Sequence, residues 1–196
     1  MTMQECERRT HYDSLAKAMA IWIFEGDFYV TSRPDQFLTT ILGSCVAVCM
    51  RDPQVGCGGM NHFLLPQGDE QHPEFPSLAL RYGSYSIERL VNAIISRGGK
   101  RERIEAKVFG GANVLAQSNP IGSRNVDFIE HYFAREGLRI AAADLRGTTA
   151  RKLRYYPVSG RAQVSEVRDS EGVAAFLAER NIGEKIAKSE GGIEVF

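Results

Sequence analysis

Two stretches of the chain space their apolar residues as an amphipathic helix does. The first has apolar residues at intervals of three and four before Gly98-Gly99, namely Ile87, Leu90, Val91, Ile94 and Ile95. The second, residues 121–137, places four apolar residues on one face, namely Val126, Ile129, Tyr132 and Phe133. It ends at Gly137, a residue suited to capping a helix. The spacing predicts two main helices, each with one face toward a core.

Shorter apolar runs bounded by turn-forming residues predict strands. The segment that begins at Cys45 and is broken at Asp52-Pro53 indicates strand, turn, strand. Residues 104–108 alternate between apolar and charged side chains before Gly110-Gly111, which predicts a half-buried strand. Three more extended runs follow, at 138–145, 151–158 and 161–167.

Strands that come in clusters, rather than in strict alternation with helices, are typical of α+β proteins. We therefore predict an α+β fold of mixed, largely antiparallel, sandwich-like sheets flanked by two main helices. We expect one domain over residues 1–169, of which 1–26 form a peripheral N-terminal part, followed by a helical extension at 170–196. Two local features are also expected: a hairpin around Glu25-Gly26-Asp27 and a surface loop at 67–76.

Composition narrows the functional classes. The 196 residues include 24 Lys and Arg and 24 Asp and Glu, so the net charge is zero and a nucleic acid partner held by bulk electrostatics is not expected. The apolar runs are far shorter than the roughly 20 residues that span a bilayer, and the first residues do not resemble a signal peptide. We expect a cytoplasmic protein without membrane insertion, whose four cysteines are reduced.

Cys45, Cys49, Cys57 and His62 lie close together in the sequence, so a zinc site is the first hypothesis. If the first two cysteines share a strand, their α-carbons lie about 13 Å apart. Two sulfurs on one zinc ion are separated by no more than about 4.6 Å. The spacing therefore argues against a metal, and we expect neither a metal nor a cofactor.

The alternative is that one thiol is a nucleophile. A thiol reacts near neutral pH when an imidazole takes its proton, which makes Cys45 and His62 candidates. Gly43 and Ser44 would allow a tight turn before Cys45 and leave backbone N–H groups to face an oxyanion. The residues alone leave two other interpretations open: Cys57 as the nucleophile, and cysteine and histidine as packing residues.

Four motifs distinguish these interpretations. Residues 39–48 (TTILGSCVAV) and 59–66 (GMNHFLLP) resemble the signature of the chemoreceptor glutamine deamidases, the CheD family. Residues 107–112 (KVFGGA) and 121–126 (IGSRNV) are similar to two further segments of that family, and Arg151-Lys152 with Ser159-Gly160 to its closing strands. These matches occur in the family's order, from about Asp27 to Val167.

The resemblance implies a catalytic cysteine, histidine and threonine, which by position are Cys45, His62 and Thr39, with Thr40 as the neighbour most easily confused with Thr39. It also implies cysteine-hydrolase-like chemistry. The thiolate attacks a glutamine side chain of a methyl-accepting chemotaxis receptor, a thioester forms, and water releases glutamate, with His62 as general base and acid. For a substrate on a helical bundle we expect a shallow groove, with these candidate residues: Asn61, Phe63 and Phe109.

Other functions stay open at this point. The resemblance also permits a non-enzymatic partner of the chemotaxis phosphatase CheC, and thiol chemistry is shared by general amidases and transglutaminase-like enzymes. One departure concerns the turn after residue 144, where the family has D-x-G-G and this chain has Arg146 in place of a glycine. We expect either a turn of another shape or a position that never needed glycine.

Overall fold

The structure is a computed structural model that describes residues 10–65, 76–114 and 121–167. Over these residues the chain forms two five-stranded sheets. Sheet A has the order β1 (Thr10–Asp13), β2 (Ala18–Trp22), β4 (Gln36–Leu42), β9 (Arg151–Tyr156) and β10 (Arg161–Glu166). Sheet B has the order β3 (Phe28–Thr31), β6 (Cys57–Phe63), β5 (Val46–Asp52), β7 (Glu105–Gly110) and β8 (Ile140–Leu145).

Most neighbouring strands in the two sheets are antiparallel. The parallel pairs among the described strands are β2 with β4 in sheet A and β7 with β8 in sheet B. The helices are α2 (Pro76–Ile95) and α3 (Ile121–Glu136), with a short 3-10 helix, η1 (Arg101–Arg103), before β7. The predicted α+β class, with mixed and largely antiparallel sheets, is confirmed; a likeness to cysteine hydrolases stays a prediction.

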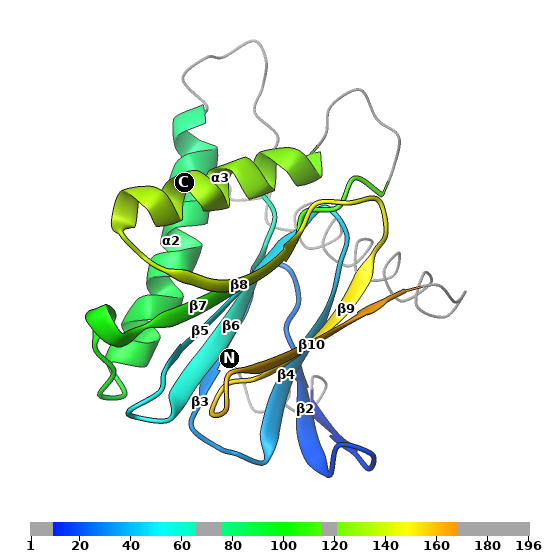
Figure 1. The fold of residues 1–196 in the computed structure, drawn as a ribbon, viewed down its shortest axis with the longest axis vertical. Coiled ribbons are helices and arrows are strands. Elements are labelled where there is room, and N and C mark those ends of the chain that lie inside the picture. Colours follow the sequence, from blue (N-terminus) through cyan, green and yellow to red (C-terminus); the bar gives the residue numbers. More distant parts are fainter. Residues whose placement is uncertain (1–9, 66–75, 115–120, 168–196) are drawn as a thin grey trace, which may run out of the picture.

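The molecule has three layers, in which sheet B is the middle one (Figure 1). Helices α2 and α3 cover one face of sheet B, and sheet A lies on the other side. Strand β5 shows the division: Val46, Val48 and Met50 belong to the cluster packed under the helices, whereas Ala47 and Cys49 belong to the cluster between the sheets. Alternate residues of the central strands therefore enter two different cores.

Both predicted helices are present. The apolar face of α2 is fully buried at Ile87, Leu90, Val91 and Ile94, although Ile95 at the C-terminal end is 39% exposed. Gly137 has φ of 63° directly after α3, and the next residue, Leu138, donates its N–H to the carbonyl of Phe133 over 3.0 Å. This is the capping arrangement that the glycine predicts.

The turn between β5 and β6 is fixed by a buried carboxylate. Asp52 accepts hydrogen bonds from the backbone N–H groups of Gln54 and Lys100, both at 2.9 Å, and from the Arg103 guanidinium at 2.8 Å. The hydrogen bond from Arg103 lowers the pKa of Asp52 to about 2. The predicted strand, turn, strand arrangement is confirmed, and its turn is tied to η1.

The predicted hairpin around Glu25-Gly26-Asp27 is wrong. Strand β2 pairs with β1 and β4 in sheet A, whereas β3 pairs with β6 in sheet B, so the connection crosses from one sheet to the other. Ala20, Ile21 and Ile23 are buried, so this part of the chain is not peripheral as expected. Their burial reflects the position of β2 between two strands of sheet A.

Several predictions fall outside the described residues. The helical extension at 170–196 and the loop at 67–75 belong to this group, whereas Pro76, assigned to the same loop, is the first residue of α2. The division into a domain at 1–169 and an extension stays a prediction. Neither helix described here combines the length and the apolar character that crossing a bilayer requires.

Candidate active site

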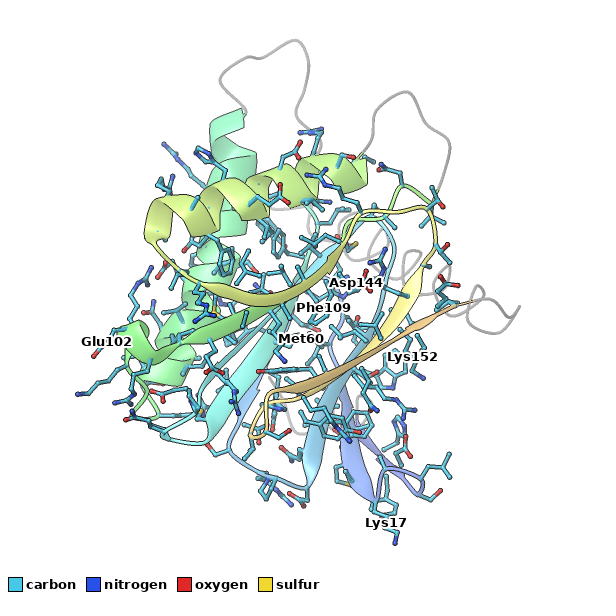
Figure 2. All side chains as sticks on the ribbon, in the orientation of Figure 1. Lys17, Met60, Glu102, Phe109, Asp144 and Lys152 are labelled. Carbon is cyan, nitrogen blue, oxygen red and sulfur yellow. The ribbon has the colours of Figure 1, made fainter. Side chains whose placement is uncertain are left out.

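Cys45 and His62 lie on the same face of sheet B. Cys45 directly precedes β5, and Ala47, two residues later, is paired with His62 on β6. Residues two apart on a strand share a face, so Cys45 and His62 are diagonal neighbours, a relation in which α-carbons are about 7–8 Å apart and β-carbons less. This face points toward sheet A, as Met60 and Phe109 in the same layer show (Figure 2). The strand register thus brings the two candidate residues together.

The backbone of residues 43–45 is held by hydrogen bonds to its three carbonyl groups. Gly43 accepts a hydrogen bond from the N–H of Ala112 over 2.7 Å, and Cys45 accepts one from the N–H of Gly111 over 2.8 Å. Between them, Ser44 accepts one from Nδ2 of Asn125 over 2.8 Å. Because three successive carbonyls are engaged by β7's extension and α3, the backbone around Cys45 has a defined orientation.

Two glycines make this close approach sterically feasible. A β-carbon on Gly110 would overlap the carbonyl oxygen of Cys45, and one on Gly111 would overlap the Val126 side chain. Both residues also have positive φ, 109° and 67°, which side chains rarely tolerate. The sequence GGA therefore allows residues 43–45, the candidate nucleophile segment, to pack directly against it.

Asn125 connects the candidate nucleophile segment to the end of β6, the strand that carries His62. Its side chain is fully buried, donates to the Ser44 carbonyl, and accepts a hydrogen bond from the N–H of Leu65 over 2.9 Å. A buried amide that satisfies both its donor and its acceptor in this way fixes two backbone segments at once. It is the residue through which α3 contributes to the site.

The His62 ring is oriented by contacts at one nitrogen. Nδ1 lies 2.9 Å from the hydroxyl oxygen of Thr40 and 3.2 Å from the carbonyl oxygen of Ile23. A carbonyl only accepts hydrogen bonds, so we assign the ring proton to Nδ1. Nε2 is buried and has no hydrogen-bond partner among the described residues. In this tautomer Nε2 carries a lone pair, as a base requires.

Burial keeps this imidazole neutral. His62 is 2% exposed, and desolvation lowers its pKa to about 4, although the hydrogen bond with the Ile23 carbonyl opposes the shift. The His62 backbone is also tied to the β2–β3 connection, since its carbonyl accepts from Gly26 at 2.8 Å and its N–H donates to Asp27 at 3.0 Å. The ring is therefore neutral and fixed in place at physiological pH.

The connection between β2 and β3 also reaches the thiol. Sγ of Cys45 donates a hydrogen bond to Oε2 of Glu25 over 3.6 Å. Glu25 is exposed, whereas Cys45 is 9% exposed. The thiol therefore lies directly below the surface, with a carboxylate on its solvent side.

The structure does not contain the expected contact between Thr39 and His62. The Thr39 hydroxyl donates to the carbonyl of Leu153 on β9 over 2.9 Å, and Thr40 contacts His62 instead. The cause is the alternation of β4: Thr40 lies on the face of Leu38 and Leu42, which packs between the sheets. Thr40 thus has the position that was expected for Thr39.

The three expected groove residues are separated by sheet B. Asn61 and Phe63 are buried on the helix side, where Asn61 binds the Val48 N–H and the Ser86 hydroxyl and Phe63 packs edge-on against Phe128. They do not line a groove with Cys45, because neighbouring residues of a strand point to opposite faces. Phe109 lies on the Cys45 side but is buried between the sheets.

The other described cysteines are buried in different cores. Cys49 lies between the sheets, where burial raises the pKa of its thiol well above the usual value. Cys57 lies under the helices. Because Cys57 is on the opposite face of sheet B from Cys45 and Cys49, the three sulfurs are not placed to share one ion.

The turn after β8 supports the same region. Arg146 has φ of 69°, and its N–H donates to the carbonyl of Gly110 over 2.9 Å. Its guanidinium forms ion pairs with Asp127 and Glu130 of α3, at 2.8 and 3.0 Å. The arginine adopts positive φ, the conformation that a glycine favours, and its side chain gains two partners, so the turn forms without a glycine at this position.

Several contributors to the site were not expected from the sequence: Glu25, Thr40, Gly110, Gly111 and Asn125. The last three lie in segments that had been identified only as family motifs. Their function as supports of the Cys45 backbone depends on contacts between β7, α3 and the loop before β5, which sequence spacing does not reveal. Glu25 was assigned to a hairpin turn, so its contact with the thiol was not foreseen.

Comparisons with known proteins agree with the resemblance. A family model described as CheD chemotactic sensory transduction matches residues 64–166. A protein of Rhodopseudomonas palustris (strain BisA53), named probable chemoreceptor glutamine deamidase CheD, is 47% identical over 91% of this chain and 84% of its own length. A protein of the same name from Burkholderia vietnamiensis (strain G4 / LMG 22486) is 44% identical over 95% of this chain and 76% of its own length.

A third relative of that name, from Bordetella parapertussis (strain 12822 / ATCC BAA-587 / NCTC 13253), is 43% identical over 88% of this chain and 82% of its own length. The match to the family model begins after His62, but the relatives align with nearly the whole chain. At this identity and coverage the chain belongs to the CheD family.

Proposed function

We propose that this protein deamidates glutamine side chains of methyl-accepting chemotaxis receptors, with Cys45 as nucleophile and His62 as general base and acid. The observation that carries the proposal is the state of His62. Its Nδ1 is engaged by Thr40 and Ile23, and its buried Nε2 has no partner on the described residues. The unengaged nitrogen belongs to a ring on the same face as the Cys45 side chain.

In the first half of the reaction, Nε2 of His62 takes the proton of the Cys45 thiol and the sulfur attacks the amide carbon of the substrate glutamine. The carbon–oxygen double bond opens to an oxyanion. When the bond between carbon and nitrogen breaks, the imidazolium returns its proton to the nitrogen and ammonia leaves. A thioester between Cys45 and the glutamyl side chain remains.

In the second half, His62 takes a proton from water, and the resulting hydroxide equivalent attacks the thioester carbon. The sulfur leaves and receives the proton, so the product is a glutamate side chain and the original thiol. Thr40 and the Ile23 carbonyl hold the ring through both steps, in the part that the third member plays in a catalytic triad. Thr40 replaces Thr39 in this role.

The backbone around Ser44 and Cys45 is the proposed site for the oxyanion. The carbonyls of Gly43, Ser44 and Cys45 are engaged toward β7 and α3. A segment fixed in this manner presents its N–H groups in one orientation, and donors that need no reorganisation are the ones that stabilise a developing charge. Asn125 acts as a positioning residue because it binds Ser44.

Burial lowers the pKa of His62 to about 4, so at physiological pH the imidazole is in the neutral form, which a base needs in order to accept a proton. The substrate assignment rests on the relatives, which are named probable chemoreceptor glutamine deamidases. A cytoplasmic location stays a prediction.

Mass spectrometry of a receptor cytoplasmic fragment tests the proposal. Incubation with the protein is expected to convert specific glutamines to glutamate, a shift of about one mass unit, and Cys45→Ala is expected to abolish it. Cys49→Ala removes a thiol from the same face of sheet B and serves as the matched control, with activity retained. Receptor deamidation by Cys45→Ala at the wild-type rate would refute the mechanism.

The same variant addresses the other function that the resemblance permits. Binding of the chemotaxis phosphatase CheC stays a prediction. If this protein binds CheC, Cys45→Ala is expected to retain that binding, because the thiol lies below the surface and its removal leaves the surrounding backbone in place.

A further inference from the structure

Glu25 is a charged residue at the candidate nucleophile that the mechanism above does not use. Its Oε2 accepts the hydrogen bond from Sγ of Cys45 over 3.6 Å, and its side chain is exposed. The residue next to it, Gly26, donates its N–H to the His62 carbonyl, and Asp27 accepts from the His62 N–H. The carboxylate is therefore carried by a backbone that the catalytic histidine itself holds.

The position of the Glu25 carboxylate determines which atoms of a bound substrate it can contact. For attack, the amide carbon has to come within about 3–3.5 Å of Sγ. The amide nitrogen is bonded to that carbon and carries two N–H donors, which need acceptors once they leave water. An acceptor 3.6 Å from the sulfur is within reach of this NH₂ group.

We propose that Glu25 is the substrate-binding residue that selects an amide over a carboxylate at Cys45. Its carboxylate accepts a hydrogen bond from the NH₂ group of the glutamine side chain and repels the carboxylate of the glutamate product. This inference rests on the proposed deamidase function. Glu25 takes no proton and forms no bond in either half-reaction; it orients the amide and favours release of the product.

Charged and titratable groups around Glu25 are consistent with this assignment. Tyr82 of α2 lies alongside the connection, since a β-carbon on Gly26 would lie 3.6 Å from its hydroxyl. Burial raises the pKa of Tyr82, and the negative charges of Glu25 and Asp27 add to that shift, whereas Arg89 opposes it. The Glu25 carboxylate lies 3.6 Å from Sγ of Cys45, so its charge also acts on a ligand bound there.

Alkylation of Cys45 measures the selection without any receptor. Iodoacetamide carries an uncharged amide and iodoacetate a carboxylate, and both react with the same thiolate. The rate for each reagent is determined by mass spectrometry of the peptide that contains Cys45, and the ratio of the two rates is compared between variants. A change in the thiolate fraction scales both rates equally, so the ratio reports only how the site treats the reagent.

In Glu25→Gln the preference for iodoacetamide over iodoacetate is expected to fall at least about fivefold, because one nearby charge is removed. Glu102→Gln, which removes the same charge from η1, is the matched control and is expected to keep the wild-type ratio. An unchanged ratio in Glu25→Gln would overturn the proposal.

A second measurement uses the receptor fragment. Glu25→Gln is expected to lower kcat/KM for deamidation about tenfold and to increase inhibition by a fragment that already carries glutamate. Deamidation and product inhibition at wild-type values would also overturn the proposal. If the wild-type protein deamidates no receptor fragment, the proposed function fails, and the alkylation ratio still decides whether Glu25 discriminates against a carboxylate.

Discussion

At the scale of single residues, the site depends on which of two adjacent threonines faces the histidine. Thr39 and Thr40 are both buried, because every residue of β4 is buried, and only Thr40 contacts His62. Thr39 is bound to the Leu153 carbonyl and has a structural part in sheet A. The two residues therefore allow a comparison of the same chemical change on opposite faces of one strand.

Thr40→Val is expected to lower kcat/KM for deamidation by about 10–100-fold, because the valine has the shape of threonine but no hydroxyl to orient His62. Thr39→Val is expected to leave kcat/KM unchanged and to reduce the free energy of unfolding by about 1 kcal/mol. Thr40→Ser restores a hydroxyl and is expected to recover most of the activity. Equal kinetics in the two valine variants would contradict the assignment of Thr40.

Cys45 and His62 could be selected from the sequence because family motifs contain them, but the groove residues and the threonine could not. On a strand with both faces buried, apolar and polar residues do not alternate, so nothing in residues 36–42 tells which threonine faces His62. Phe63 and Phe109 are both buried aromatics, and only the pairing of β5 with β6 and β7 assigns them to opposite faces of sheet B.

At the scale of elements, the candidate nucleophile segment is supported by the extension of β7, the start of α3 and the turn after β8. That turn is the place where Arg146 adopts φ of 69°. Its ion pairs with Asp127 and Glu130 are exposed, and such pairs contribute about 0–1 kcal/mol each. A positive φ on a residue other than glycine costs about 1 kcal/mol or more, so the two effects are of similar size.

Two substitutions separate these effects. Arg146→Ala loses both ion pairs and keeps a side chain at positive φ, whereas Arg146→Gly loses the pairs but relieves the backbone. We expect the glycine variant to lie within about 1 kcal/mol of the wild type and the alanine variant to be less stable than the glycine variant by about 1 kcal/mol. Urea unfolding measures both. Equal stability of the two variants would show that the turn does not require positive φ.

The helices and most strands could be predicted because each has a pattern of its own. Residues 87–94 and 126–133 repeat with helical spacing, and β7 alternates. The hairpin at Glu25 could not be distinguished from a crossing between sheets, since both need two apolar runs and a polar turn. Which strands pair depends on packing far along the chain, as in the partnership of β4 with β9.

At the scale of the whole molecule, three layers bury a titratable histidine. The folded state lowers the pKa of His62 from 6.5 to about 4. Between these values the unfolded chain binds a proton that the folded protein does not. The ionisation of His62 therefore leaves the free energy of unfolding at its full value above pH 6.5 and lowers it as the pH falls toward 4. Asp52, whose pKa is lowered to about 2, stabilises the fold above its unfolded value of 3.8 and loses this contribution only as the pH falls from there toward 2.

Between pH 6.5 and pH 4 the wild-type protein is expected to lose about 3 kcal/mol of unfolding free energy because of His62. His62→Gln removes the titrating ring and is expected to flatten this dependence, whereas His11→Gln, at an exposed position on β1, is expected to keep it. Denaturant unfolding over this pH range provides the comparison. The same slope in His62→Gln as in the wild type would show that His62 is not buried in the neutral form.

The central claim is that Cys45 carries the glutamyl group during the reaction. The direct test is to quench a mixture of protein and receptor fragment with acid, where thioesters survive, and to identify the attached peptide by mass spectrometry. We predict a receptor peptide joined through its glutamine to Cys45, with a mass lower than the sum of the two peptides by one ammonia, and released by hydroxylamine. Receptor deamidation with the acyl group on another cysteine, or with none on Cys45 at any time point, would contradict the mechanism.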